Sequence, residues 1–338
     1  MLVNYTLFQF VSKYSSNYTF AYAWPTIELP ERSFNPILSW QEVSRRKSTG
    51  DELAQLPNGM IHDEDIIPGH SAVNSHGDIV VGKKPYNIKI IAKTGESKVV
   101  NLPEPSECKV IKQHIAGLAV DKNNKVYVVR KFQTRTENGD VESFVLDVLD
   151  ENYNEKLNSR KLEYLQATRY YDVMIAITKN NNIVMIQYGD PQVYICDNSG
   201  KLKHKFERGS RFPCLGISGQ DEIMVSSDDD QTVEIYSEKG NLKLTIELPE
   251  GHSVNGVAFH YAICKIIVLT YVEGNDSNFL LCYTEAGELE TTTFFSKRIG
   301  VEYWLIINSH PSGAVAIIRN TCIIFIGMNN YLRIRTVL

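Results

Sequence analysis

An eight-residue pattern that alternates apolar and polar residues and ends in a turn recurs along this chain, and it restricts how the chain can fold. Glycine or asparagine closes each copy, and both residues tolerate a left-handed backbone. Each copy therefore predicts a β-strand that enters a tight turn. The six copies are IKIIAKTG (88–95), VLDVLDEN (145–152), VYICDNSG (193–200), VEIYSEKG (233–240), LLCYTEAG (280–287) and CIIFIGMN (322–329).

Two further strands precede each copy, and a more polar strand follows it. IAGLAVDKNNKVYVV (115–129) shows the upstream pair, and NLKLTIEL (241–248) shows the strand that follows. The turn positions 95, 152, 200, 240, 287 and 329 are spaced by 40 to 57 residues. Four short strands in each period of about 40 to 50 residues are typical of a propeller. The sequence predicts an all-β fold, a six-bladed β-propeller with four-stranded antiparallel blades, over residues 68–338.

The polarity of the predicted strands agrees with this architecture. The first two strands of each unit are apolar on both faces, as expected for strands between neighbouring blades. The fourth strands, such as KLKHKF (201–206), carry lysine and arginine, which suits a solvated outer edge protected against pairing with other sheets.

Three consecutive acidic residues, Asp228 to Asp230, precede the copy at 233–240. They fall between the second and third strands of the fourth blade. The corresponding connections GKKPYN (82–87) and YGDPQ (188–192) do not share the acidic cluster. A calcium site needs several converging oxygen ligands. We interpret the three aspartates as the tip of a solvated loop, with a bound cation as the alternative.

The best copies resemble the NHL-repeat propellers, which often form the C-terminal domain of tripartite-motif proteins. GLAVDKNNKVYVV and EIMVSSDDDQTVEIYSEKGNLKL are similar to the family pattern, and the resemblance covers about residues 68 to 338. Asn87, Gln192 and Thr232 stand where the family usually has arginine. The resemblance implies a propeller that binds protein or RNA on the face where the blade-to-blade connections lie.

Residues 1–67 lie outside the repeat. YTLFQFVSKYSSNYTFAYAW (5–24) predicts two strands, and residues 33–56 predict a short helix and a polar linker. We interpret this region as an N-terminal β/linker appendage of the propeller. An incomplete extra blade, a strand that closes the ring and the stub of a longer chain are the alternatives. No RING, B-box or coiled-coil pattern occurs in it.

Composition limits the cellular setting and the partners. The net charge is −5, so the chain as a whole does not match a phosphate backbone electrostatically. No apolar run reaches the roughly 18 residues of a membrane helix, and the N-terminus lacks a basic n-region. The six cysteines form no CxxC pair, and most lie in apolar strands. We expect reduced, buried thiols, a cytoplasmic protein and no membrane partner.

Successive strands of a blade are antiparallel, so the loops between second and third strands share a face with the blade-to-blade connections. Aromatic and arginine side chains concentrate in these segments, and such side chains are typical of binding hot spots. We predict that a partner binds on this face. The predicted contact residues are Tyr86, Tyr170, Tyr188, Arg208, Arg211, Phe212, Arg298 and Trp304.

Two function classes compete for this face. The first is a non-catalytic recognition or scaffold module that binds a protein partner, and we favour it. The second is an RNA-binding propeller, for which KLKHKFERGSRF (201–212) offers lysines and Phe212 for phosphate contact and base stacking. We interpret that stretch instead as an edge strand kept soluble by lysine.

The third class is a metal-dependent propeller hydrolase, similar to the gluconolactonases, which hold a central metal with acidic and amide side chains. The predicted inner strands offer Asn74, Asp121, His260 and Asn308 but no glutamate. We interpret the two asparagines and the aspartate as turn residues, and also His76 and His310. GxSxG, P-loop and dinucleotide motifs do not occur. The sequence therefore predicts no catalytic residue, no metal and no cofactor.

Overall fold

The structure is a computed structural model of the chain. It describes residues 5–9, 21–25, 66–84, 86–92, 96–102, 110–137, 139–166, 172–208, 213–227, 231–272, 277–297, 306–313, 315–319, 322–326 and 334–337.

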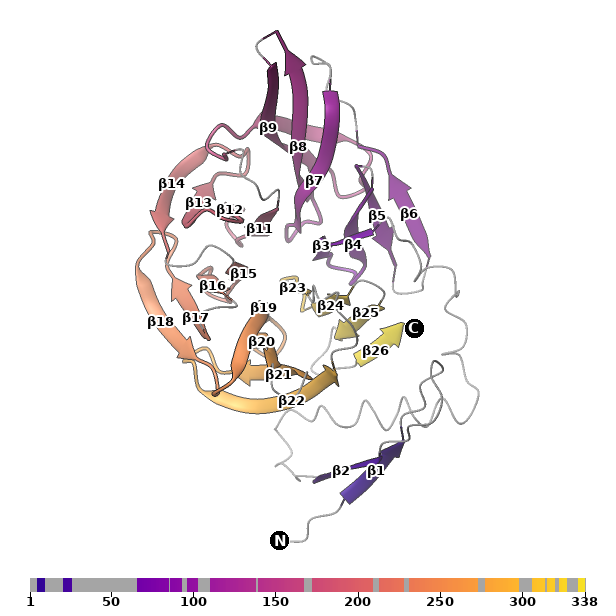
Figure 1. Cartoon of the computed structure of the whole chain (residues 1–338), viewed down its shortest axis with the longest axis vertical. Coiled ribbons are helices and arrows are strands. Elements are labelled where there is room, and N and C mark those ends of the chain that lie inside the picture. The colour runs from indigo at the N-terminus through magenta and orange to yellow at the C-terminus, as the bar shows by residue number, and fades with distance from the viewer. Residues whose placement is uncertain are drawn as a thin grey trace.

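Every strand from β3 onward belongs to a four-stranded antiparallel sheet in which the strands pair in chain order (Figure 1). The described strands form six such sheets. The first three are β3 (Ile66–Val73), β4 (Ile79–Lys83), β5 (Asn87–Ile91) and β6 (Ser97–Val100); β7 (Val110–Val120), β8 (Val126–Thr136), β9 (Gly139–Leu149) and β10 (Lys156–Lys161); and β11 (Val173–Ile177), β12 (Ile183–Gln187), β13 (Gln192–Cys196) and β14 (Leu202–Glu207). The others are β15 (Pro213–Ile217), β16 (Ile223–Ser227), β17 (Thr232–Tyr236) and β18 (Leu242–Glu247); β19 (His252–His260), β20 (Lys265–Val272), β21 (Ser277–Tyr283) and β22 (Leu289–Lys297); and β23 (Ile306–Ser309), β24 (Val315–Arg319), β25 (Cys322–Ile326) and β26 (Ile334–Val337).

The first strands of neighbouring sheets contact one another around a common axis. β3 contacts β7, β7 contacts β11, and the series continues through β15, β19 and β23 back to β3. The first strands thus surround the axis, and the fourth strands lie on the outside of the ring (Figure 1). The chain is an all-β propeller with four-stranded antiparallel blades, as the repeat predicts.

The ring closes where the last sheet meets the first. β23 and β24 both contact β3, and the Asn308 side-chain amide donates a hydrogen bond of 3.0 Å to the hydroxyl of Ser71, 237 positions away. The prediction that Asn308 forms a turn is therefore wrong. It is a strand residue at the closing seam, and His310 occupies the turn.

The core consists of apolar wedges between adjacent sheets. All five residues of β12 are buried, because one side of the strand packs toward the second blade and the other toward the fourth. The outer strands are less buried, and in β14 half-buried residues alternate with exposed ones. The predicted burial of inner strands and solvation of outer strands is confirmed.

The turns that end the recurring pattern also fix how blades pack. Gly240 has a φ of 82°, and a methyl group added there would lie 2.6 Å from the ring of Phe206 on the preceding blade. Glycine is required at this position by both backbone and space. In the second blade, the left-handed residue is Tyr153, with a φ of 64°, and not Asn152 as predicted. Positions 95 and 329 lie outside the described residues.

The N-terminal region contains an antiparallel pair of strands, β1 (Tyr5–Gln9) and β2 (Ala21–Pro25), in the stretch predicted to form two strands. This pair lies outside the ring of blades in Figure 1. The helix predicted within residues 33–56 falls outside the described residues. Across the described ranges, the structure contains no helix long and apolar enough to span a membrane.

The described cysteines have free thiols. Cys196 and Cys282 are buried in strands as predicted, and Cys214 is half-buried. Cys264 departs from the prediction because it lies exposed in the turn before β20, with a φ of 53°. The two buried strand cysteines thus pack as small apolar side chains.

Candidate functional site

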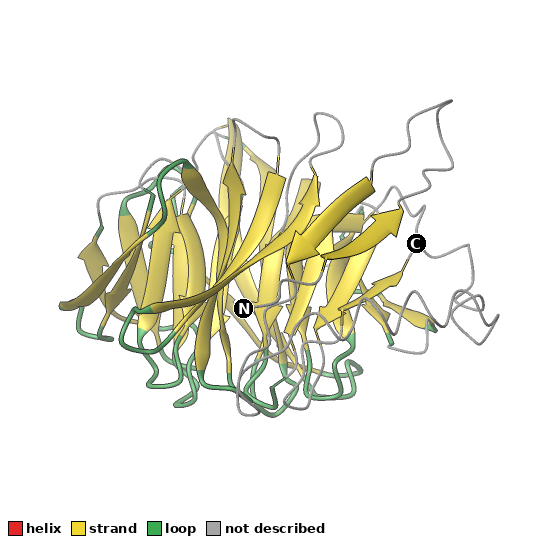
Figure 2. Ribbon diagram, turned by 90° about the horizontal axis from the view of Figure 1, so that it is seen from below, coloured by secondary structure: helices red, strands yellow, loops and turns green. Residues whose placement is uncertain are grey.

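The antiparallel strands place the loops of each blade on two rims, which Figure 2 shows edge-on. We call one the turn rim, which carries the loops joining first to second and third to fourth strands. The other is the connection rim, which carries the loops joining second to third strands and the segments between blades. The predicted contact residues belong to the connection rim.

Two predicted contact residues are half-buried on the connection rim. Tyr86 lies in the loop between β4 and β5, and Tyr188 follows β12 and donates a backbone hydrogen bond of 3.0 Å to the carbonyl of Asp172. The other predicted contacts except Arg208 lie outside the described residues, as do Asp228 to Asp230. They are Tyr170, Arg211, Phe212, Arg298 and Trp304.

The expectation of an exposed Arg208 is wrong, because only 3% of this residue is accessible. It directly follows β14, and its guanidinium donates to the backbone carbonyl of Asp190 at 3.3 Å. Burial lowers the pKa of Arg208 to about 10, although the nearby Asp190 carboxylate opposes this shift. Arg208 holds the connection between blades and presents no free charge to a partner.

The second blade carries a feature that the sequence analysis missed. Its strands β7, β8 and β9 have 11 residues each, and their ends project beyond the other blades (Figure 1). We call residues 110–114, 131–136 and 139–144 the arm. The upstream pair was predicted to span residues 115–129, although the strand pattern continues on both sides.

The arm lies on the connection rim and carries its own ion pairs. Lys131 contacts Glu142 at 2.7 Å, and Arg135 contacts Asp140 at 2.9 Å. Two apolar side chains remain exposed, Ile111 at 46% and Val141 at 45%. The segment 139–143 of β9 pairs with β8 alone, because the residues of β9 that pair with β10 begin at Val145. The arm therefore carries Val141 on this unpaired edge of β9 and Ile111 on β7, at its opposite edge.

A histidine–aspartate contact lies at the base of the arm. His70 Nε2 is 3.1 Å from Asp172 Oδ1, although these residues belong to the first and third blades. His114 lies on the same rim, and burial together with Lys112 and Lys131 lowers its pKa. This contact joins two blades across the second one and was not predicted.

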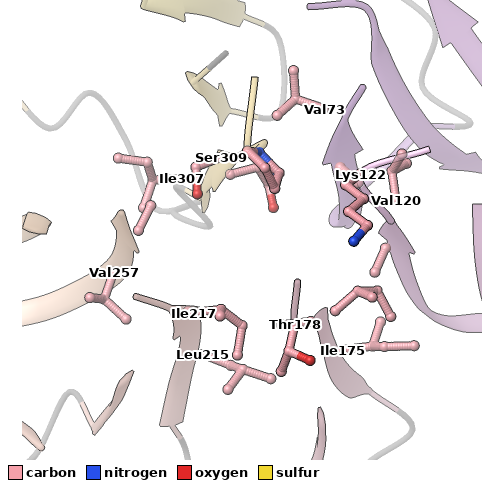
Figure 3. A pocket seen from close by; sticks show the side chains of 18 of the residues that line it. Val73, Val120, Lys122, Ile175, Thr178, Leu215, Ile217, Val257, Ile307 and Ser309 are labelled. Carbon is pink, nitrogen blue, oxygen red and sulfur yellow. The ribbon is translucent and has the colours of Figure 1, made fainter. Parts of the chain in front are cut away.

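The central channel opens at the turn rim (Figure 3). Its cavity volume is about 70 Å³. Aliphatic side chains supply most of the described lining, and the polar groups are those of Lys122, Thr178, Tyr261, Asn308 and Ser309. Among the residues that the structure describes, no group of three or more histidine, cysteine, aspartate or glutamate side chains is arranged to hold a metal.

Hydrogen bonds between neighbouring blades run along the turn rim. Ser75 accepts from the Asn124 amide at 2.7 Å, and Lys122 donates to the carbonyl of Lys179 at 2.7 Å. The backbone N–H of Lys179 in turn donates to the carboxylate of Asp221 at 2.7 Å. The described turns of the first four blades are thus tied one to the next.

The inner-strand polar residues that could suggest a metal site instead stabilise turns. The side-chain oxygen of Asn74 accepts from the backbone N–H groups of His76 and Asp78 at 2.9 and 2.8 Å. Asp121 does the same for Asn123 and Lys125 at 2.8 and 2.9 Å. The interpretation of Asn74 and Asp121 as turn formers is confirmed.

The histidines of the turn rim differ from one another. His76 is exposed, whereas His310 is buried and its Nε2 lies 3.0 Å from the carbonyl oxygen of Asp121. His310 stands where Asn74 stands in the first blade, so the two histidines do not occupy equivalent positions. His260 is 1% exposed, and burial lowers its pKa to about 4, which keeps the ring neutral.

No protein-family model matches the chain. No curated protein sequence matches it either. Its structure is similar to that of a catalytically inactive virginiamycin B lyase from Staphylococcus aureus, with a TM-score of 0.52 and 14% identity over 81% of this chain and 85% of the lyase. It is also similar to a protein of unknown function from Bacteroides caccae, with a TM-score of 0.51 and 11% identity over 69% of this chain and 83% of that protein. At these identities the likeness concerns the fold alone.

Proposed function

We propose that the chain is a six-bladed, NHL-like propeller that acts as a non-catalytic recognition module and binds a protein partner through its connection rim. The observation that carries this proposal is the arm. Its strands extend beyond the ring. Val141 is exposed on the segment of β9 that pairs with β8 alone, and Ile111 is exposed on β7, at the opposite edge of the same sheet. An unpaired sheet edge is a template for an extended segment of a partner, which adds to it as a further strand.

Aromatic side chains on the connection rim also support this proposal. Tyr86 and Tyr188 are half-buried there, so part of each residue is accessible to a partner. Aromatic side chains have few rotatable bonds, so their binding costs little conformational entropy. They are also enriched in hot spots. The sequence places Arg211, Phe212 and Trp304 in the same set of connections, and we propose them as further contacts.

RNA is the alternative ligand for this rim. The contacts of the basic stretch argue against RNA binding on this rim. Lys203 donates a hydrogen bond of 3.1 Å to the Asn182 side chain, and the Lys205 ammonium lies 5.9 Å from the ring centre of Tyr194. These lysines therefore lie on the outer strand β14 and not on the connection rim. A hydrolase with a central metal would need acidic ligands, whereas the polar side chains of the described channel lining are an ammonium, an amide and hydroxyl groups.

Quantitative affinity capture from cell extract tests the proposal. We expect the Ile111→Ser/Val141→Ser variant and the Arg211→Ala/Phe212→Ala/Trp304→Ala variant each to recover roughly tenfold less of the partner than the wild type, because hot-spot residues dominate binding. The Leu157→Ser/Leu242→Ser variant is the matched control, since these exposed residues (49% and 52%) lie on outer strands.

Recovery that is equal among both rim variants and the control would contradict the proposed rim. Recovery of RNA in place of protein, with affinity that falls steeply as salt is added, would instead support the RNA alternative.

A further inference from the structure

We infer that His310 makes the closing seam of the propeller sensitive to acid. While its imidazole ring is neutral, it ties the turn of the sixth blade to the first two blades, and protonation of the ring releases that turn. The site lies on the turn rim, opposite the arm. The inference therefore goes beyond the proposed recognition function and does not depend on it.

The turn between the first and second strands has the same design in several blades. Its first residue uses a side-chain atom to accept a backbone N–H from two or four residues ahead. In the first four blades these acceptors are oxygen atoms, which belong to Asn74, Asp121, Thr178 and Ser218. In the sixth blade the acceptor is a ring nitrogen of His310, and the backbone N–H of Ser312 donates to it at 3.1 Å. A ring nitrogen differs from these oxygens because it loses its acceptor capacity near neutral pH.

Two hydrogen bonds determine which form of the His310 ring fits this turn. Nδ1 accepts the N–H of Ser312, so it carries no hydrogen of its own. The hydrogen of a neutral imidazole then lies on Nε2, which donates to the carbonyl oxygen of Asp121 at 3.0 Å. His310 is 2% exposed, and the neutral ring uses both of its nitrogens. The folded seam therefore requires neutral His310.

These bonds hold three blades together. The His310 ring reaches Asp121 in the second blade, 189 positions away. The Ser312 hydroxyl donates to the backbone carbonyl of Ser75 in the first blade at 3.2 Å. We call His310, Ser312, Ser75 and Asp121 the clasp. It lies at the seam where the ring closes.

Protonation of His310 is incompatible with the clasp as it stands. Nδ1 becomes a donor, and the Ser312 hydroxyl at 2.9 Å can accept from it, but the backbone N–H of Ser312 then faces another donor and loses its bond. The positive charge would also be buried, which is costly unless the charge is paired. The carboxylate of Asp121 already accepts from backbone N–H groups and from the Tyr127 hydroxyl.

The groups around the ring set the pH range of this effect. Burial lowers the pKa of His310, the carbonyl and carboxylate of Asp121 oppose this shift, and the neighbouring imidazole of His76 adds to it. In an open seam the ring regains its ordinary pKa of 6.5. The clasp therefore contributes fully above that pH, and its contribution falls as the pH drops from 6.5 toward the lowered pKa of the closed seam. His260, with a pKa of about 4, stays neutral in this range.

Hydrogen exchange of the full chain, followed by mass spectrometry, tests this inference. Samples at about pH 7.5 and about pH 5.5 are compared, with labelling times adjusted for the pH dependence of chemical exchange. We expect the sixth-blade turn, residues 310–313, to lose protection about fivefold or more at the lower pH. The third-blade turn, residues 178–182, is the internal reference and should keep its protection, because its acceptor Thr178 does not titrate.

Two variants assign the effect to His310. His310→Asn supplies an amide oxygen as acceptor, as Asn74 does in the first blade, and cannot be protonated. Its sixth-blade turn should show the same protection at both pH values. His76→Asn is the matched control, because it removes the exposed imidazole beside the clasp and should keep the acid response of the wild type.

The inference is overturned if the wild-type turn 310–313 keeps its protection in acid, a result that does not depend on whether a variant folds. It is also overturned if His310→Asn keeps the acid response. Equal losses in the turns of the third and sixth blades would count against it as well, because acid would then unfold the propeller as a whole. Partner capture through the connection rim at neutral pH can succeed or fail independently of these outcomes.

Discussion

Replacing Asp147 with alanine is expected to lower the free energy of unfolding by about 3–5 kcal/mol, because the variant leaves a buried arginine without its counter-charge. Asp147 is fully buried, and its Oδ2 contacts Arg130, which is 1% exposed. The other nearby cation, Lys156, lies 4.0 Å from Asp147 Oδ1. Denaturation by urea, followed by circular dichroism, measures the loss.

Two control variants show whether this loss of stability comes from the unpaired buried charge. Asp140→Ala removes the exposed partner of Arg135 on the arm and should cost much less stability, because solvent screens this pair. Arg130→Met/Asp147→Leu removes both buried charges and should recover most of the stability, since a buried pair can often be exchanged for apolar side chains. If Asp147→Ala costs no more than Asp140→Ala, the buried pair does not stabilise the second blade as described.

Replacing Gly117 with alanine is expected to destabilise the propeller by about 3 kcal/mol or more, through overpacking against backbone. Gly117 follows a β-bulge in β7, and a methyl group there would overlap the carbonyl oxygen of Val173 on β11. A backbone carbonyl in a neighbouring strand cannot rotate away as a side chain can. The second and third blades would have to separate near the axis, and thermal unfolding with hydrogen exchange of β7 and β11 measures this.

Gly82→Ala is the matched control for this substitution. Gly82 is also a strand glycine, but its added methyl group would meet the Cβ of His70 at 3.3 Å and side-chain atoms of Ile115 at 3.5 Å. Small shifts relieve such contacts, so a loss of about 1 kcal/mol is expected. Equal losses for Gly117→Ala and Gly82→Ala would show that the inner strands do not approach as closely as the structure indicates.

The repeat could be predicted because each blade needs the same kind of turn between its strands. A left-handed residue closes the recurring pattern after the third strand, and Gly200, Gly240 and Gly287 supply it in the third, fourth and fifth blades. Asparagine, aspartate and glycine adopt that conformation most readily, so the turns are visible in the sequence. Strand order followed from the turns, and burial followed from the apolar pattern.

Features that depend on contacts between segments that are apart in the sequence could not be predicted. Arg208 is buried because the loop after β12 covers it, and its sequence context is that of an exposed basic stretch. Asn308 was predicted to be a turn residue, yet its partner Ser71 is 237 residues away. Tyr153 is left-handed where the pattern favoured Asn152, and its hydroxyl accepts from Asn74 on the preceding blade at 3.0 Å. In each case a distant residue, and not local propensity, determines the position.

The most direct test of a ring closed by its first and last blades is a disulfide across the seam. Ser71→Cys/Asn308→Cys replaces a hydrogen-bonded pair whose side-chain atoms are 3.0 Å apart, and Cys264→Ser in the same chain removes an exposed thiol that could compete. After mild oxidation, peptide mapping by mass spectrometry should find residues 71 and 308 joined within one chain. A chain that oxidises only between molecules, or leaves these two thiols free, would contradict a closed propeller.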